Sequence, residues 1–355
     1  MAFIKEAISK VVKSQNLSEE EARLTMTELI DSTASPSQIA SLLTALRMKG
    51  ETVDEIAAFA TVMREHARTI NPRVSGRLTD TCGTGGDALK TFNISTISAL
   101  VVAGAGAPIA KHGNRSFTSK CGSADLLEKL GVNINAEPEK VQSSIERAGI
   151  GFMFAPVFHS ATKNVSVPRK EIGVRTVFNI LGPLTNPANA KAQLLGVYEV
   201  GLVMKLTKVL VKLGLESAIV VHGMDGFDEI SLIGKTHVAR FLNGNIKEEI
   251  LSPSSFGLEL RKFEEIAPPE EIDEHVLVAL RVLSGSKDQR NAVRDTVLAN
   301  SSAGLLASGM AKDYSEGVEL ARSSLKSGKA LEKLTQLVKY SGGDIAVTEG
   351  LLRKL

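Results

Sequence analysis

Hydrophobic positions at the start of the chain repeat at helical spacing. Apolar residues between Phe3 and Val12 recur every three to four positions, which predicts one amphipathic helix. Three further helix starts carry a Ser or Thr followed three positions later by Glu or Gln: Ser18 with Glu21, Ser35 with Gln38, and Thr52 with Glu55. In such a capping box each side chain satisfies a backbone N–H at the helix start. Asn71-Pro72 is expected to end the fourth helix, because a residue before proline disfavours helical backbone.

Beyond residue 72 the pattern changes to short β-rich runs separated by helical stretches. Strands are expected at Leu78–Cys82, Pro108–Ala110, Leu194–Tyr198 and Ala218–Val221. Helices are expected at Ser95–Ala103, Ser123–Leu130, Leu202–Leu213 and over most of residues 273–341. This alternation is typical of an α/β domain with a mostly parallel central sheet flanked by helices. The sequence therefore predicts a small all-helical domain at residues 1–71 and a larger α/β domain at residues 72–355.

Composition and charge exclude several classes of protein. Of 355 residues, 43% are apolar and 23% are charged, as in ordinary globular proteins. The 42 Lys and Arg residues nearly balance 40 Asp and Glu residues, so no large surface for nucleic acid or anionic membrane is expected. The longest nearly apolar run, Ile97–Ala110, has 14 residues, whereas a membrane-spanning helix needs about 20. We expect a cytoplasmic protein with no nucleic-acid and no membrane partner.

A glycine-rich loop follows the first predicted strand. Within Asp80–Asp87, three glycines occupy positions 83, 85 and 86. Glycine lets backbone N–H groups turn toward a ligand, and such loops bind phosphate oxygens. A helix is expected to begin near Asn93, and its N-terminus would attract the same anion. A tight strand-to-helix turn accounts for the glycines equally well, so both interpretations stay open from the residues alone.

A polar loop, Lys111–Ser119, follows the next predicted strand. Its Lys and Arg supply positive charge and its hydroxyls supply hydrogen bonds, which suits a phosphorylated ligand. Taken alone, a solvated loop is the simpler interpretation. Ligands of α/β proteins, however, collect beyond the carboxyl ends of parallel strands, and this loop follows the strand after the glycine-rich one. That order favours phosphate binding.

An acidic segment, Asp225–Glu229, follows the strand predicted at Ala218–Val221. Neighbouring carboxylates can bind a hard cation through oxygen, although an exposed acidic turn explains the spacing as well. Because Mg²⁺ commonly bridges a few carboxylates and a substrate's phosphates, the two phosphate-like loops favour a metal site. Of the six histidines, His112 and His159 lie in suggestive positions, and no nucleophile–base pattern is evident.

Taken together, the motifs resemble the anthranilate phosphoribosyltransferase family of tryptophan biosynthesis. The matching segments occur in family order at Cys82–Asp87, Asn93–Thr96, Lys111–Ser116, Gly122–Asp125, Gly173–Thr176, Leu181–Pro187 and Asp225–Glu229. The resemblance implies transfer of the phosphoribosyl group of 5-phosphoribosyl 1-pyrophosphate (PRPP) to the amine of anthranilate, giving N-(5-phosphoribosyl)anthranilate and pyrophosphate. It also implies one or two Mg²⁺ ions, a homodimer, and a helical excursion near residues 160–190 that joins the small helical domain.

The resemblance further implies the residues that bind each ligand. Those for PRPP are Gly83, Gly86, Asp87, Thr91, Asn93, Ile94, Ser95, Thr96, Lys111, His112, Gly113, Asn114, Arg115, Ser116, Phe117, Thr118, Ser119 and Ser123. Those for anthranilate are Gly83, Asn114 and Arg169, and those for the metal are Ser95, Asp228 and Glu229. No general acid or base is expected, because the aromatic amine is already neutral at pH 7.

Two relatives with the same fold match the sequence less well. Pyrimidine nucleoside phosphorylases carry a lysine-rich catalytic signature that is not evident in this chain. A nucleic-acid-binding paralogue without anthranilate activity is disfavoured by the net charge of +2 and by the Asp228-Glu229 pair. Just before Arg169, Ser160 and Thr162-Lys163 replace the family's more usual Pro and Met-Arg.

Overall fold

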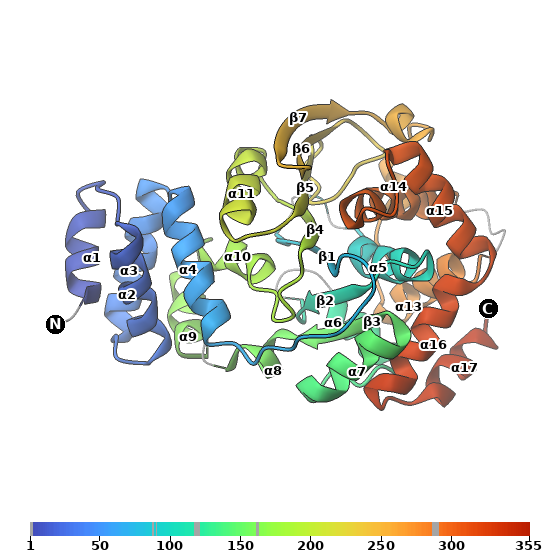
Figure 1. Cartoon of the computed structure of the whole chain (residues 1–355), viewed down its shortest axis with the longest axis horizontal. Helices are drawn as coiled ribbons and strands as arrows, with labels where there is room; N and C mark the ends of the chain where they lie inside the picture. The colour runs from blue at the N-terminus through green and yellow to red at the C-terminus, as the bar shows by residue number, and fades with distance from the viewer. Residues whose placement is uncertain (1–2, 87–88, 90, 117–120, 161–162, 286–290) are drawn as a thin grey trace.

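A bundle of helices forms one end of the molecule in the computed structural model, which describes residues 3–86, 89, 91–116, 121–160, 163–285 and 291–355 (Figure 1). The helices of this end are α1 (Phe3–Val11), α2 (Glu19–Ile30), α3 (Pro36–Lys49) and α4 (Val53–Glu65). All three expected capping boxes are present, with both bonds made in each. Helix α4 ends before Asn71, because the chain after it bonds elsewhere: Arg68 N–H donates to Phe158 O and Ile70 N–H to Pro187 O.

A seven-stranded sheet lies at the centre of the rest of the molecule, in the order β3-β2-β1-β4-β5-β6-β7. Its strands are β1 (Thr79–Gly83), β2 (Ile109–Gly113), β3 (Ile150–Phe154), β4 (Ala192–Gly196), β5 (Ser217–Gly223), β6 (Thr236–Leu242) and β7 (Asn245–Leu251). Strands β1 to β5 are parallel, and β6 and β7 add an antiparallel edge. The mostly parallel sheet is confirmed; β3, β6 and β7 are additions to the predicted strands.

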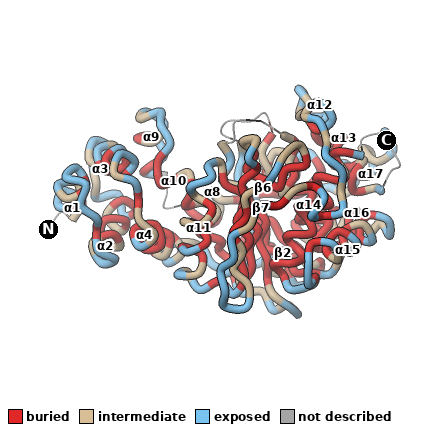
Figure 2. The backbone as a smooth tube through the Cα atoms, turned by 90° about the horizontal axis from the view of Figure 1, so that it is seen from above, coloured by how far each residue is buried: buried red, intermediate tan, exposed pale blue. Residues whose placement is uncertain are grey.

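Helices cover both faces of the sheet. The helices that follow the N-terminal bundle, not all of which touch the sheet, are α5 (Ile94–Gly104), α6 (Ser123–Lys129), α7 (Pro138–Ala148), α8 (Ala155–Phe158), α9 (Lys163–Ile172), α10 (Phe178–Leu181), η2 (Gly182–Leu184), α11 (Gly201–Lys212), η3 (Pro253–Phe256), α12 (Phe263–Ile266), α13 (Ile272–Leu283), α14 (Asn291–Ser308), α15 (Tyr314–Lys326), α16 (Lys329–Ser341) and α17 (Ile345–Leu352). Alternate strand residues face opposite layers: Leu194 and Ile219 share a cluster with α5 and α14, whereas Leu195 and Val220 share one with α11. Each face of the sheet therefore has its own buried cluster, and these residues are among those coloured as buried in the middle of Figure 2.

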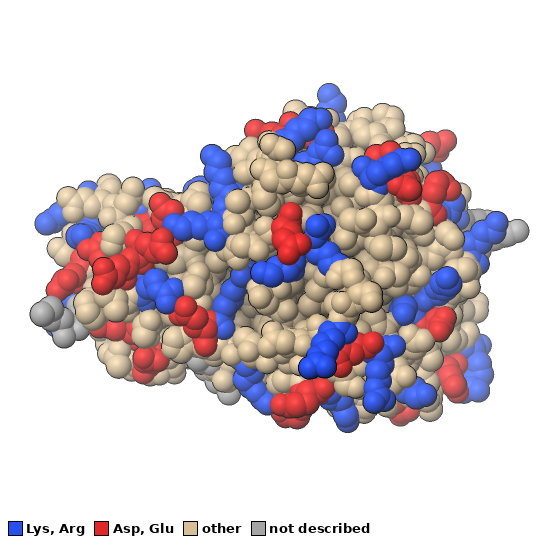
Figure 3. Space-filling model, in the orientation of Figure 1, with Lys and Arg blue, Asp and Glu red and all other residues tan. Residues whose placement is uncertain are grey.

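Helices from the middle of the chain pack against the N-terminal bundle. Helix α9 contacts α2 and α3, and α4 contacts α10 and α11. Lys and Arg side chains are interspersed with Asp and Glu over the face seen in Figure 3. Among the described helices, none is both long and apolar enough to cross a membrane.

Candidate active site

The glycine-rich loop leaves β1 at the carboxyl edge of the sheet. Gly85 and Gly86 adopt positive φ angles of 66° and 77°, a region that favours glycine. Thr84 N–H donates to Gly196 O at 2.9 Å, which ties the loop to the end of β4. Gly85 N–H donates to Asp228 Oδ2 at 2.7 Å. An amide of this loop therefore already binds an anionic oxygen, as expected of a phosphate-binding loop. Asp87 lies outside the described residues.

The two candidate metal ligands are buried at the same edge. Asp228 and Glu229 are only 9% and 7% exposed, which excludes the alternative of an exposed acidic turn. A Cβ atom at Gly196 would lie 1.5 Å from Asp228 O, and one at Gly83 would lie 2.4 Å from Asp228 Oδ2. The ends of β1 and β4 can hold the acidic segment this closely only because both positions are glycine.

Lys111 lies beneath the start of α5 and is buried within the sheet. Its Nζ donates to Thr81 O at 2.7 Å and to Ser95 Oγ at 3.4 Å. Burial lowers the pKa of Lys111, while the neighbouring charge of Asp80 acts in the opposite direction. Burial likewise raises the pKa of Asp80, which accepts hydrogen bonds from Asn186 Nδ2 at 2.8 Å and from His112 N–H at 3.3 Å. Lys111 is thus held by the sheet while reaching the first turn of α5.

Helix α5 points its N-terminus into this region. Asn93 is its N-cap, and Asn93 Nδ2 donates to Cys121 O at 3.1 Å. Asn93 Oδ1 and the Thr96 hydroxyl are buried and have no hydrogen-bond partner among the described residues. Ile94 is buried, whereas Thr91 and Ser95 are half-buried. Unsatisfied polar atoms beside a helix N-terminus fit an anionic ligand with further acceptor and donor atoms.

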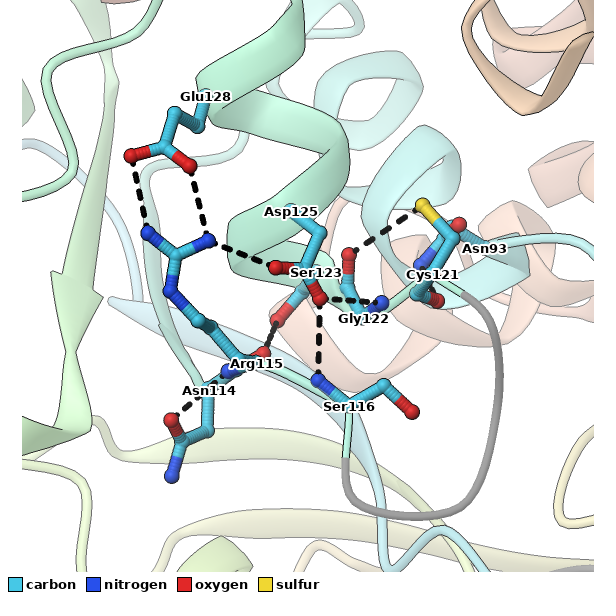
Figure 4. A network of polar contacts seen from close by, with 9 residues as sticks. All are labelled: Asn93, Asn114, Arg115, Ser116, Cys121, Gly122, Ser123, Asp125 and Glu128. Carbon is cyan, nitrogen blue, oxygen red and sulfur yellow. Dashed lines mark hydrogen bonds and ion pairs between the residues drawn. The ribbon is translucent and has the colours of Figure 1, made fainter. Parts of the chain in front are cut away.

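The described part of the second predicted loop, which ends at Ser116, is folded back on α6 (Figure 4). Ser123 Oγ donates to Asn114 O at 3.1 Å, and Asp125 accepts from the N–H groups of Ser116 and Gly122. The Arg115 guanidinium pairs with Asp125 at 2.7 Å and with Glu128 at 2.8 Å, and these two carboxylates raise its pKa. The charge of Arg115 is therefore neutralised by α6, and phosphate binding would require the guanidinium to leave these pairs. Phe117, Thr118 and Ser119 lie outside the described residues.

Two buried histidines lie at the end of β2: His112 is in the strand, just before Gly113, and His159 packs against it. The ring centroids of His112 and His159 are 5.0 Å apart, and His159 Nε2 donates to Thr185 O at 3.1 Å. Burial lowers the pKa of His112 to about 3 and the pKa of His159 to about 4, and the neighbouring His159 lowers that of His112 further. Both rings are neutral at pH 7, so His112 cannot contribute positive charge to a bound phosphate.

Unfolding should take up extra protons as the pH falls below about 6.5, the usual pKa of an imidazole. Above that pH both rings are neutral in both states. Below it only the unfolded chain binds the protons, so the free energy of unfolding falls until the folded pKa values, about 3 and about 4, are reached. Chemical denaturation at several pH values between about 4.5 and 7 measures this slope. In His159→Gln, which keeps a donor for Thr185 O, the uptake should drop by about one proton; an unchanged slope would contradict neutral burial of His159.

Arg169, the predicted anthranilate ligand, lies half-buried on α9. Its guanidinium carbon is 5.1 Å from the centroid of the Phe178 ring, and burial lowers its pKa. Arg175, in a matched motif but without an assigned role, donates to Gly86 O and stacks at 4.2 Å over Tyr198. The only sequence signal for Arg175 was its place in the Gly173–Thr176 motif, because its contacts depend on folding.

The donor set fits magnesium. Within the described ranges, no group of three or more His, Cys, Asp or Glu side chains is placed to hold a metal ion. Magnesium commonly takes only one or two protein carboxylates and completes its shell with water and substrate phosphates. Asp228 and Glu229 are hard oxygen donors beside the glycine loop, and the Ser95 hydroxyl lies at the start of α5. This arrangement suits a cation that arrives with a phosphorylated substrate.

Comparisons with known proteins agree along the whole chain. Residues 75–331 match the glycosyl transferase family a/b domain, and residues 5–67 match the helical bundle domain of that family. Anthranilate phosphoribosyltransferase of Pelotomaculum thermopropionicum is 50% identical, covering 96% of this chain and 97% of its own. The Thermus thermophilus enzyme is 41% identical with a TM-score of 0.88, covering 95% of this chain and 99% of its own. The Saccharomyces cerevisiae enzyme in complex with PRPP and Mg is 30% identical with a TM-score of 0.86, and the match covers 96% of this chain and 98% of the yeast chain. A second structure of the yeast enzyme holds 4-fluoroanthranilate.

Proposed function

This chain belongs to the anthranilate phosphoribosyltransferase family, and on that premise we propose which of its residues bind each substrate and the metal. The enzyme transfers the phosphoribosyl group of PRPP to the amine of anthranilate in tryptophan biosynthesis, releasing pyrophosphate. The observation that carries the assignment is the bond from Gly85 N–H to the Asp228 carboxylate at the ends of β1 and β4. It joins the glycine loop and the acidic segment in one site.

The glycine loop and the start of α5 bind PRPP in this proposal. Backbone N–H groups of the loop and of the N-terminus of α5 donate hydrogen bonds to the pyrophosphate oxygens, and Lys111 adds positive charge through its contact with Ser95. As the ribosyl carbon loses pyrophosphate, these fixed donors stabilise the negative charge that gathers on the leaving group. Asp228 and Glu229, with Ser95, hold one or two magnesium ions. When bound, magnesium supplies further positive charge toward the phosphates.

Arg169, Asn114 and Gly83 bind anthranilate in this proposal. A planar guanidinium can donate two parallel N–H bonds to the carboxylate that lies beside the amine of anthranilate. Holding that carboxylate orients the amine toward the ribosyl carbon, and this proximity adds to the rate gained from stabilising the leaving pyrophosphate. Because the amine is already neutral, its attack needs no prior deprotonation. The half-buried position of Arg169 favours this role over that of an exposed charge on a helix.

The assembly and location remain part of the proposal. We propose that residues 1–71 with the 160–190 excursion form one domain and residues 72–355 the other, that the enzyme is a homodimer, and that it acts in the cytoplasm. The contacts of α9 with α2 and α3 support the excursion.

A steady-state assay of the purified chain tests the function. Product should form only with both substrates, and chelation of Mg²⁺ with EDTA should abolish it, with recovery when Mg²⁺ is restored. Undiminished turnover in EDTA would contradict the metal assignment, and turnover of nucleosides with phosphate instead would favour the phosphorylase alternative.

Replacing Arg169 by Ala should weaken the use of anthranilate while sparing PRPP. A lost charge-assisted hydrogen bond is worth about 1.5–3 kcal/mol, or about one to two decades in kcat/KM for anthranilate. Kinetics with each substrate varied in turn measure the effect. Lys170→Ala is the matched control, because the neighbouring side chain is exposed on the same helix. An unchanged anthranilate kcat/KM in Arg169→Ala would leave Asn114 as the better candidate.

A further inference from the structure

A buried asparagine of α14 holds the backbone next to the two candidate metal ligands. Asn300 is fully buried, and its Oδ1 accepts the N–H of Ile230 at 2.9 Å. Its Nδ2 donates to Ile230 O at 3.1 Å and to Thr296 O, within α14, at 3.0 Å. The amide group therefore binds both backbone polar atoms of the residue that directly follows Glu229.

The three bonds leave the amide only one orientation. If the oxygen and nitrogen of Asn300 were exchanged, two donors would face each other at Ile230 N–H, and two acceptors would face each other at Thr296 O. Helix α14 is itself fixed, because it packs against β1, β4, β5 and α5. The backbone of Ile230 is consequently held at a set position relative to α14.

The acidic segment is constrained from the opposite side as well. Asp228 O lies against Gly196 so closely that a Cβ atom there would come within 1.5 Å of it. Beyond Ile230, Ser231 N–H donates to Thr236 Oγ1 at 2.9 Å, at the start of β6. Asp228 and Glu229 thus lie between the ends of the strands and a buried side chain from a helix 70 residues further along the chain.

We propose that Asn300 is a positioning residue for the Asp228 and Glu229 carboxylates, fixing the backbone that presents them to magnesium. The proposal rests on the proposed function, because it assumes that these carboxylates bind the metal. Groups that orient metal ligands commonly alter metal affinity or activity by about 10–100-fold when they are removed. A purely structural Asn300 would instead change stability alone.

The test compares the Mg²⁺ requirement of two Asn300 variants with that of wild type. Asn300→Leu has a similar volume and removes every bond to Ile230, whereas Asn300→Asp keeps an acceptor and removes the donors. We expect the Mg²⁺ concentration for half-maximal activity to rise about 10–100-fold, with most of kcat recovered at saturating Mg²⁺. Ser302→Ala is the control, because Ser302 is buried in the same helix and its hydroxyl donates to Ala299 O within that helix.

A second readout needs neither activity nor metal. In the wild-type chain without Mg²⁺, amide hydrogen exchange at Ile230 should be as slow as in the central strands, and it should become fast in Asn300→Leu. Exchange in wild type at the rate of exposed loop amides would overturn the proposal even if both variants failed to fold. Reduced thermal stability with an unchanged Mg²⁺ midpoint in a folded Asn300 variant would overturn it too.

Variants of the carboxylates separate this proposal from the one on which it rests. If Asp228→Asn and Glu229→Gln raise the Mg²⁺ midpoint but the Asn300 variants do not, only the positioning role is wrong. If none of them changes the midpoint, the assignment of the metal site fails, and the role of Asn300 fails with it.

Discussion

Replacing Asp228 by Asn and Glu229 by Gln in one chain should lower kcat/KM for PRPP by about 100-fold or more at ordinary Mg²⁺, the usual cost of removing a fixed electrostatic contact to a leaving group. The amide variants keep the shape of both side chains. Shape matters because both side chains are buried, so truncation to Ala would leave cavities. A fall in activity could then come from a displaced loop and not from the loss of a metal ligand. Raising the Mg²⁺ concentration should recover part of the loss.

The control for this variant removes the same charge elsewhere. Glu270 and Glu271 are consecutive and exposed, so Glu270→Gln with Glu271→Gln changes net charge equally without touching the site. Circular dichroism and thermal unfolding establish that each variant is folded. Wild-type activity and an unaltered Mg²⁺ requirement in folded Asp228→Asn/Glu229→Gln would remove both residues from the mechanism.

The N-terminal helices were predictable because their signals are local. A capping box places both partners within four residues, so Ser18, Ser35 and Thr52 mark helix starts whatever the tertiary fold. The end of α4 was predicted too late for the opposite reason. Its position depends on bonds from Arg68 and Ile70 to Phe158 and Pro187, which are distant in the sequence.

Two of the three strands missing from the prediction, β3 and β7, differ in their environment. All five residues of β3, Ile150–Phe154, are buried, so its sequence has no alternation between apolar and polar positions. Strand β7 is the opposite case: it lies at the edge of the sheet, is mostly exposed, and carries Lys and Glu residues that suggest a loop. Alternation of apolar and polar residues identifies a strand best when one face is buried and the other is exposed to solvent, and neither β3 nor β7 meets that condition.

The candidate site also has features that the sequence indicated and features that only the fold reveals. The glycine loop and the acidic pair are each contiguous in sequence, so residue types alone marked them as candidates, while a tight turn and an exposed acidic turn stayed open as alternatives. The burial of Asp228 and Glu229 was not evident, because it depends on the tertiary fold: Gly83 and Gly196 come close to Asp228, and Asn300 binds the backbone of Ile230. The neutral state of His112 is non-local too, since it results from burial beside His159. Residue types suggested which groups to assign to the site, and the fold determines how far those groups are buried and which partners they have.

Gly196→Ala should disrupt the site by adding a single methyl group. Its Cβ would lie 1.5 Å from Asp228 O, and this overlap involves backbone on both sides, so no side-chain rotation can relieve it. Strand β4 cannot yield easily, because it is paired with both β1 and β5. The acidic segment must therefore move away from the strand ends and from the amide of Gly85. We expect kcat/KM for PRPP to fall about 100-fold or more, with a loss of about 1–3 kcal/mol in the free energy of unfolding.

Gly201→Ala is the matched control for this substitution. Gly201 is the first residue of α11, and the nearest atom to an added Cβ is 3.9 Å away, so the methyl group is accommodated and the helix gains about 0.4–1 kcal/mol. Denaturant unfolding measures the lost stability of Gly196→Ala. Displacement of the metal ligands is measured separately, because the folded variant should still need more Mg²⁺ than wild type. If Gly196→Ala folds and keeps both the wild-type kcat/KM and the wild-type Mg²⁺ midpoint, the close approach of β4 to Asp228 does not position the metal ligands, and the glycine serves chain packing alone.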